Sequence, residues 1–289
     1  MSTLTPELLG FIQSGDHAWT KHLRGTQVEF RALRKIRELL VAEELQVEIF
    51  GVSPQDMSSA SELVVVQETG GEVIGAFVPG HDGESAAGAV IGWGGYLHGE
   101  PRMLSDYLMV RPAHRNLGIG AELKKLQAGL AATHGYGLVI WTVDPLRAAN
   151  ARLNIEKLGA TCHLYEQNRY GESFGTALYG GMPTDRLHMH WRIDSPRTIE
   201  RMISGAVRHE GSLDGLPLWR RNSTDSMVAV ELPRDIDGLL KANPEEARGW
   251  RYALREELEG AFAEGWEITG FALTADGQHG RYLLERRNS

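Results

Sequence analysis

The stretch DYLMVRPAHRNLGIGA, residues 106–121, decides the expected fold because it joins the end of an apolar strand, a turn with glycines and the start of a helix. Gly118 and Gly120 let backbone N–H groups approach a ligand closely. The helix N-terminus carries about half a positive charge, and Arg115 adds a mobile counter-charge. A phosphate or pyrophosphate is therefore the predicted ligand of this turn.

Two nucleotide-binding motifs do not fit the same turn. A dinucleotide fingerprint requires glycines where the sequence has Asn116 and Leu123. A P-loop requires Lys and then Ser or Thr after its last glycine, whereas Gly120 is followed by Ala121 and Glu122. On this segment alone, an ordinary strand-to-helix turn without a ligand remains the structural alternative.

The region after the turn alternates helix and strand. Apolar residues at helical spacing predict a helix that ends at Gly135, where glycine is a natural C-terminal cap. This stripe consists of Ile119, Leu123, Leu126 and Leu130. A strand over 138–143, a helix over 147–158 and a strand over 161–165 are predicted to follow. Such alternation indicates a crossover connection and hence a mixed or parallel sheet.

Turn signals separate the remaining predicted elements. Upstream, the pattern predicts a helix over 27–45 and strands over 63–66, 72–78, 89–97 and 103–110. Downstream, it predicts a strand over 187–193, a helix over 198–207, a strand over 227–232, helices between 234 and 264, and strands over 266–273 and 281–284. We expect two domains, a mixed α/β domain over 1–185 and a small α+β subdomain over 186–289.

Residues 110–121 resemble the Arg-x-x-Gly-x-Gly/Ala loop that binds the acyl-CoA pyrophosphate in the GNAT (N-acetyltransferase) superfamily. Asn150, nine residues before Gly159, is similar to a second segment of that family. WTVDPL at 141–146 and features of the tail resemble a branch of predicted acyltransferases with an added C-terminal subdomain. The resemblance implies an acyl-CoA N-acyltransferase fold and activity, with acetyl-CoA or succinyl-CoA as co-substrate. It also implies that the acceptor is a small-molecule amine such as an amino acid.

The resemblance also assigns acyl-CoA contacts to residues of this chain. It places the thioester carbonyl against the backbone N–H of Val110. Asp144 is a candidate for the acyl-CoA site, and a cap of the helix that begins near residue 147 is its favoured, structural interpretation. The residues implied in acyl-CoA binding are Met109, Val110, Arg115, Asn116, Leu117, Gly118, Ile119, Gly120 and Ala121, followed by Asp144, Asn150 and Asn154.

Acyl transfer to an amine needs a group that takes the proton of the amine. Asp106 lies four residues before Val110, at a strand position from which several family members present a base. His98 and His114 are alternative bases, because histidine titrates near neutral pH. A purely structural carboxylate paired with Arg102 or solvent is the remaining interpretation of Asp106.

The departing thiolate must also be protonated, and here the chain departs from the family. The tyrosine that often serves as the acid is replaced by Ile155. Tyr165 and Tyr170 are therefore the candidate acids. Arg169 and Arg186 are predicted to bind a carboxylate of the substrate, since guanidinium groups hold carboxylates in a bidentate manner. Structural ion pairing is the alternative for both arginines.

Composition limits the classes of partner. Among 289 residues, 30 Lys and Arg stand against 38 Asp and Glu, and the net charge of −8 argues against nucleic-acid binding. One cysteine, Cys162, excludes an internal disulfide and a cysteine-based zinc cluster, and no metal is expected. We find no signal-peptide plan and no membrane-spanning stretch, so a cytoplasmic location is expected. A monomer and a homodimer both remain open.

A non-catalytic module that binds or senses acyl-CoA is the alternative function. It is favoured by Ile155 at the usual tyrosine position and by the lack of an unmistakable base. Release of free CoA in the presence of amines distinguishes the two functions.

Overall fold

The computed structural model describes residues 4–80, 83–171, 181–205, 213 and 215–287. Internal contacts divide the chain into two compact units. Unit 1 comprises Met1–Trp141 and Arg192–Ile203, and unit 2 comprises Thr142–Trp191 and Ser204–Ser289. The domain boundary expected between residues 185 and 186 differs from these limits and stays a prediction.

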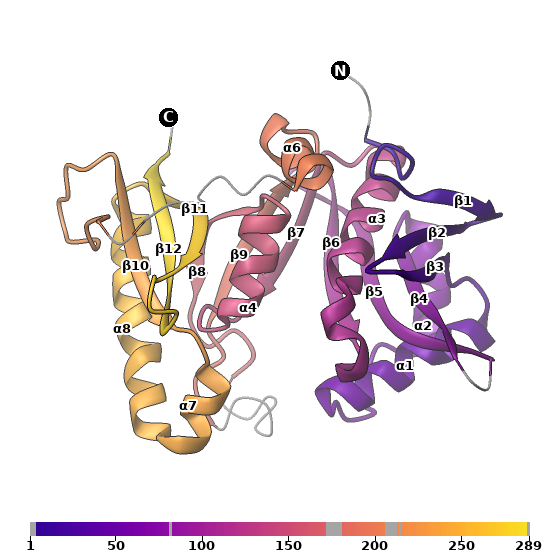
Figure 1. The fold of residues 1–289 in the computed structure, drawn as a ribbon, viewed down its shortest axis with the longest axis horizontal. Helices are drawn as coiled ribbons and strands as arrows, with labels where there is room; N and C mark the ends of the chain where they lie inside the picture. The colour runs from indigo at the N-terminus through magenta and orange to yellow at the C-terminus, as the bar shows by residue number, and fades with distance from the viewer. Residues whose placement is uncertain (1–3, 81–82, 172–180, 206–212, 214, 288–289) are drawn as a thin grey trace. The chain divides into compact units, whose positions relative to one another are not determined.

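Unit 1 is built on a sheet whose strands follow one another in chain order (Figure 1). Neighbouring strands are antiparallel except for β6 and β7, which are parallel. The strands are β1 (Ile12–Gly15), β2 (Ala18–Leu23), β3 (Thr26–Ala32), β4 (Glu72–Gly80), β5 (Gly83–Leu97), β6 (Glu100–Val110) and β7 (Leu138–Val143), of which β7 continues past the limit of the unit. The helices are α1 (Ile36–Phe50), α2 (Ala60–Val66) and α3 (Ile119–Thr133), with short 3₁₀ turns η1 (Gln67–Thr69) and η2 (Pro112–Leu117).

The central predictions for unit 1 are confirmed. Helix α3 buries Ile119, Leu123 and Leu126, and Gly135 follows its end with a left-handed φ of 83°. The predicted strands over 72–78, 89–97, 103–110 and 138–143 correspond to β4, β5, β6 and β7. The sheet is mixed, as the alternation of helix and strand indicated.

The helix predicted over 27–45 is wrong in its first part. Residues 26–32 form β3, in which Val28 and Phe30 are buried at the strand period of two. The helix begins only at Ile36. Apolar residues in this region satisfy both periods over a short window, so spacing alone did not reveal the change of element.

The strand predicted over 63–66 is also wrong, since these residues complete helix α2. Ser59 caps the helix by accepting a hydrogen bond from the amide of Glu62 at 3.3 Å. A short apolar run such as LVVV fits a buried helix as well as a strand. The cap upstream was the missed signal.

Strand β6 contains a bulge at the position that carries the candidate base. Val90 pairs with Leu108 and Gly92 with Ser105, so Asp106 and Tyr107 together lie opposite a single residue of β5. The extra residue changes which side chains face α3. Ser105 contacts α3 before the bulge, whereas Leu108 and Val110 approach it after the bulge.

Unit 2 contains a second antiparallel arrangement, in the strand order β9-β8-β11-β12-β10 (Figure 1). Its strands are β8 (Thr161–Glu166), β9 (Arg186–Arg192), β10 (Met227–Pro233), β11 (Trp266–Leu273) and β12 (His279–Arg286), of which β9 ends one residue past the limit of the unit. Its helices are α4 (Ala148–Ala151), continued by the π-helical turn η3 (Arg152–Lys157), α7 (Ile236–Ala242) and α8 (Pro244–Ala263).

Most of the predictions for the C-terminal half are confirmed. The second helix of the crossover is α4 with η3, which Gly159 follows with a φ of 78°. The helix predicted over 198–207 is α6 (Pro196–Ser204), and residues 206–207 lie outside the described part of the chain. Among the described helices, none combines the length and apolarity that a membrane crossing requires.

Candidate functional site

The turn between η2 and α3 is shaped by Gly118. Its φ of 88° lies in the left-handed region, where residues other than glycine are strained. A Cβ atom at this position would meet no heavy atom within 4 Å, so the space beside the turn is open. Glycine is required here by the backbone conformation, and a ligand can approach the turn closely.

The first amides of α3 and an exposed arginine meet at this turn. The N–H groups of Ile119 and Gly120 belong to the first helical turn, where helices leave amides without an internal acceptor. Arg115 and Asn116 are exposed, and Arg115 donates from Nε to the carbonyl of Val110 at 3.3 Å. The local chemistry therefore suits an anionic group such as a pyrophosphate.

Arg111, four residues earlier, has a different role. Its guanidinium binds Glu44 at 2.7 Å and Glu48 at 2.8 Å, and it donates to the carbonyl of Ala86 at 2.7 Å. These bonds join the end of β6 to α1 and β5. Arg111 thus anchors the start of the turn, while Arg115 remains available at the surface.

Several of the residues predicted to bind acyl-CoA can contact a ligand only through their backbone atoms. The side chains of Met109 and Ile119 are completely buried in the core. A Cβ at Gly120 would lie 3.4 Å from Val110 and 3.7 Å from Leu108, which shows that α3 begins in contact with the end of β6. The main chain, and not these side chains, is the surface that a ligand would meet.

Asp106 is exposed to solvent and accepts a hydrogen bond from the indole Nε1 of Trp93 at 3.3 Å. The surrounding protein removes part of the hydration of the carboxylate and raises its pKa, the bond from Trp93 opposes this shift, and the negative charge of Glu62 adds to it. Arg102, its proposed structural partner, donates to the carbonyl of Leu97 at 2.8 Å. A carboxyl with a raised pKa is a better proton acceptor than an ordinary aspartate.

Sequence reasoning missed Trp93 and Glu62 as neighbours of Asp106, because the bulge in β6 decides which side of the sheet each residue faces. The alternative bases lie elsewhere on unit 1: His98 in the turn between β5 and β6, with a φ of 55°, and His114 in η2.

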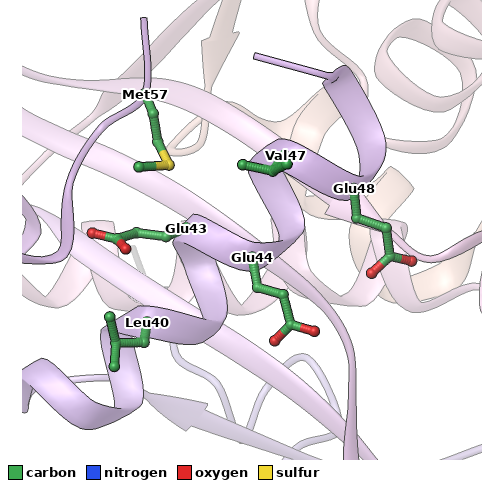
Figure 2. Close-up of a pocket in the computed structure, with 6 residues that line it drawn as sticks. All are labelled: Leu40, Glu43, Glu44, Val47, Glu48 and Met57. Carbon is green, nitrogen blue, oxygen red and sulfur yellow. The ribbon is translucent and has the colours of Figure 1, made fainter. Parts of the chain in front are cut away.

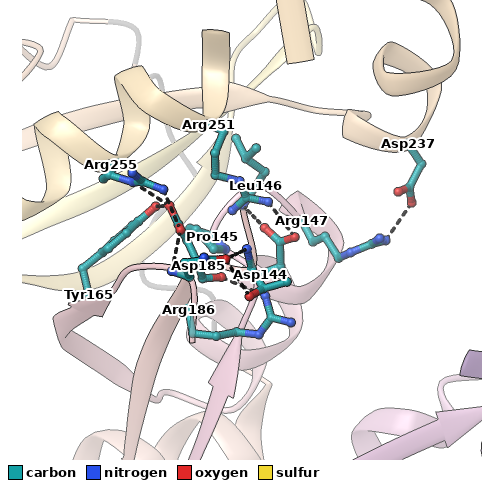
Figure 3. A network of polar contacts seen from close by, with 12 residues as sticks. Asp144, Pro145, Leu146, Arg147, Tyr165, Asp185, Arg186, Asp237, Arg251 and Arg255 are labelled. Carbon is teal, nitrogen blue, oxygen red and sulfur yellow. Dashed lines mark hydrogen bonds and ion pairs between the residues drawn. The ribbon is translucent and has the colours of Figure 1, made fainter. Parts of the chain in front are cut away.

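In unit 2, Asp144 belongs to a buried polar cluster (Figure 3). One oxygen accepts from the amide of Leu146 at 2.9 Å, and the other accepts from Arg251 at 2.8 Å. Burial alone would raise the pKa of Asp144, but the charge and hydrogen bond of Arg251 outweigh it and hold the pKa below its usual value. The predicted helix cap is wrong: α4 has Arg147 at its N-cap position without a side-chain cap bond, and Asp144 instead forms a local turn with Leu146 and a buried ion pair with Arg251 that spacing could not predict.

Tyr165 and Asp185 form the second part of the cluster (Figure 3). The hydroxyl of Tyr165 donates to Asp185 at 2.7 Å, and Arg255 binds both oxygens of the same carboxylate at 2.8 and 2.9 Å. Burial, the hydrogen bond and the charge of Asp185 all raise the pKa of Tyr165. The proton of this phenol is therefore strongly held.

The predicted carboxylate-binding arginines both lie near Tyr170. The guanidinium of Arg186 is 5.0 Å from the centre of the Tyr170 ring, and that of Arg169 is 5.6 Å away. Arg169 is exposed and ion-paired with Glu166, whereas Arg186 is buried and donates to the backbone carbonyl of Asp185 at 2.8 Å. Tyr170 itself is 43% exposed, so it is the more accessible of the two candidate acids.

The two asparagines of the second motif lie on the helix that contains the π-helical turn. Asn150 is partly exposed on α4, and Asn154 is buried within η3. Ile155 is completely enclosed, with 1% of its surface exposed. Short π-helical turns occur frequently at functional sites. Because Ile155 is enclosed, the position at which the resembled family often has a tyrosine is a packing position in this chain.

A separate surface pocket of about 490 Å³ lies along α1 (Figure 2). It is lined by Leu40, Glu43, Glu44, Val47, Glu48 and Met57. Its glutamates already have partners, since Arg111 binds Glu44 and Glu48, and Glu43 accepts from the amide of Ala60. None of the predicted site residues lines this pocket.

No family model matches the chain. No curated protein matches it either. Solved structures with similarity include a Desulfovibrio desulfuricans protein assigned to the GNAT acetyltransferase family, with 17% identity and a TM-score of 0.45 over 57% of this chain and 99% of that one. Arabidopsis thaliana Naa50 with a bisubstrate CoA analogue has 16% identity and a TM-score of 0.45 over 56% and 97%.

The Escherichia coli ribosomal-protein-S18-alanine N-acetyltransferase has 16% identity and a TM-score of 0.44 over 58% of this chain and 95% of that one. Two of these three structures are thus named as acetyltransferases, and one of the two is assigned to the GNAT family that the motifs of the sequence resemble.

Proposed function

We propose that this chain is an acyl-CoA-dependent N-acyltransferase that transfers an acetyl or succinyl group to the amine of a small molecule, with an amino acid as the favoured acceptor. One observation carries the proposal: the open, left-handed turn at Gly118 leads into the first amides of α3 at the end of the strand that presents Asp106. An anion site and a proton acceptor on one strand-turn-helix unit match what acyl transfer from CoA requires.

In this proposal the turn and Arg115 hold the pyrophosphate, and the thioester lies near the end of β6. The amine nitrogen attacks the thioester carbonyl and gives its proton to Asp106. A C–N bond forms, the C–S bond breaks, and the CoA thiolate leaves and takes a proton. Of the two candidate acids, Tyr170 is the proposed donor of that proton, because it is the more exposed residue, whereas Tyr165 is buried and its hydroxyl donates to Asp185.

The two tyrosines are expected to respond differently to removal of their hydroxyl groups. Tyr165→Phe should lower the free energy of unfolding by about 1.5–3 kcal/mol, the value of a hydrogen bond to a charged acceptor, with turnover per folded molecule unchanged. Tyr170→Phe should reduce turnover roughly tenfold or more and leave stability nearly unchanged. Urea unfolding and initial rates of CoA release measure both effects. Full activity of Tyr170→Phe would remove this residue from the mechanism.

The acceptor is proposed to carry a carboxylate that Arg169 or Arg186 binds. A charge-assisted, bidentate contact should make an amino acid roughly ten to a hundred times more efficient as a substrate than the amine without the carboxylate. Phenylalanine and phenethylamine form a matched pair for a thiol-release assay. If the plain amine reacts equally fast, both arginines have only structural roles.

A module that binds acyl-CoA without turning it over remains the second function, favoured by the enclosed Ile155 at the family tyrosine position. The two functions differ in one assay. An enzyme releases free CoA when an amine is added to the protein and acyl-CoA, whereas a binding module leaves the thioester intact.

A further inference from the structure

A lysine is buried on α3, on the side that packs against the sheet. Lys124 is only 2% exposed. Its Nζ lies 2.7 Å from Oγ of Ser105, 3.3 Å from Oε1 of Gln127 and 3.8 Å from the centre of the Trp141 ring. Burial lowers the pKa of Lys124 well below its usual value. Because taking an amine out of water is costly, a lysine at such a position requires specific contacts of this kind.

The partners of Lys124 mark the place where β6 and β7 stop pairing. Ser105 on β6 and Trp141 on β7 each come directly after the last residue of their strand that takes part in the pairing between β6 and β7. Among the described residues of both strands, no pair follows them, although β6 continues to Val110. The parallel pairs are Met103↔Val139 and Leu104↔Ile140.

Lys124 therefore contacts both strands at the point where they separate. It is hydrogen-bonded to Ser105 and stacked over Trp141, which is a favourable cation–π geometry when the amine is protonated. Gln127, one turn further along α3, is completely buried beside it. A Cβ at Gly92 of β5 would come within 2.6 Å of the Gln127 amide nitrogen, so the cluster is closely packed under the sheet.

The geometry points to Lys124 as a positioning residue that holds β6 and β7 in place where their pairing ends. As a result, the edge of β6 from Ser105 onward stays open to the pantetheine arm of an acyl-CoA. This inference rests on the proposed function. The amide groups of pantetheine can bond to an open strand edge in the way that an added strand does. Without Lys124, β7 could continue its pairing with β6 and close that edge.

The test compares two ligands and two neighbouring lysines. Lys124→Met keeps the length of the side chain and removes the amine. Lys125→Met is the matched control on the same helix, where Lys125 pairs with Glu122 at 3.2 Å. Isothermal titration calorimetry with acetyl-CoA measures binding of the whole donor. Titration with adenosine 3′-phosphate 5′-diphosphate, which lacks the pantetheine arm, measures binding at the turn alone.

We expect Lys124→Met to bind acetyl-CoA about tenfold more weakly than the wild type does, with its affinity for the nucleotide within about twofold of the wild-type value. Lys125→Met should bind both acetyl-CoA and the nucleotide within about twofold of the wild-type affinities. Equal acetyl-CoA affinity of Lys124→Met and wild type would overturn the inference. An equal loss for both ligands would also overturn it, since that indicates a general structural effect.

If Lys124→Met does not fold, Ser105→Ala provides the same comparison with a smaller change, and it should weaken acetyl-CoA binding selectively. Equal binding of acetyl-CoA by folded Ser105→Ala would then overturn the inference. Failure of the wild type to bind acetyl-CoA is a different result, because it contradicts the proposed function itself.

Discussion

Gly118→Glu is expected to lower the affinity for acyl-CoA by at least about 100-fold, which corresponds to roughly 2.7 kcal/mol. The new side chain would extend into the open space beside the turn, where the ligand has to approach. Its carboxylate would also occupy the positive end of α3 and repel the pyrophosphate. Calorimetric titration with acetyl-CoA measures the loss.

Gly135→Glu is the matched control for this substitution. Gly135 follows the other end of α3, has a φ of 83° and also has open space around its Cβ position. Both variants therefore carry a similar backbone strain of about 1–2 kcal/mol, and thermal unfolding should show comparable destabilisation. Only Gly118→Glu should lose acyl-CoA. Retained affinity in folded Gly118→Glu would contradict the placement of the pyrophosphate at this turn.

Asp106→Asn is expected to reduce turnover by roughly 10²–10³-fold with acyl-CoA affinity changed by no more than a few fold, as for loss of a general base outside the anion site. The amide cannot accept the proton of the amine, while the turn at Gly118 is unaffected. Steady-state rates and calorimetry on the same preparation separate the two effects. Wild-type turnover at neutral pH would leave Asp106 a structural residue and make His98 the better candidate.

The pH dependence of kcat/KM provides an independent check on Asp106. A base acts in its deprotonated form, so activity should fall as pH decreases through the raised pKa of Asp106. Trp93→Phe removes a hydrogen bond that lowers the pKa of the carboxyl, so it should move the acidic limb of the pH profile, where activity falls, to higher pH. Glu62→Gln removes a negative charge and should move it to lower pH. An acidic limb that neither substitution moves belongs to another group.

The parts of the fold that could be predicted from sequence are those in which one signal dominates. Helix α3 combines a regular apolar stripe with a terminal glycine, and β7 is an apolar run interrupted only by Thr142 before a turn. The predictions for the region of β3 and for helix α2 failed because no single signal dominates there. Short apolar runs satisfy more than one period there, and packing against the sheet selected the element.

The candidate site likewise contains one part that could be predicted from the sequence and one part that could not. The turn at Gly118 is encoded locally, since the glycine, the arginine and the helix start are adjacent in sequence. The environment of Asp106 is not, because it depends on the bulge in β6 and on Trp93 and Glu62 from other elements. The pairing of Asp144 with Arg251 likewise joins residues far apart in the chain.

The most direct test of the central claim is product analysis after mixing the purified protein with acetyl-CoA or succinyl-CoA and a panel of amino acids. Free thiol is followed by a colorimetric assay, and the acceptor is weighed by mass spectrometry. Acyl transfer predicts that one acceptor gains the mass of the acyl group in an amount equal to the CoA released, and that Asp106→Asn suppresses both signals. Tight binding of the acyl-CoA with no acylated acceptor and no free CoA for any amine would contradict an acyltransferase.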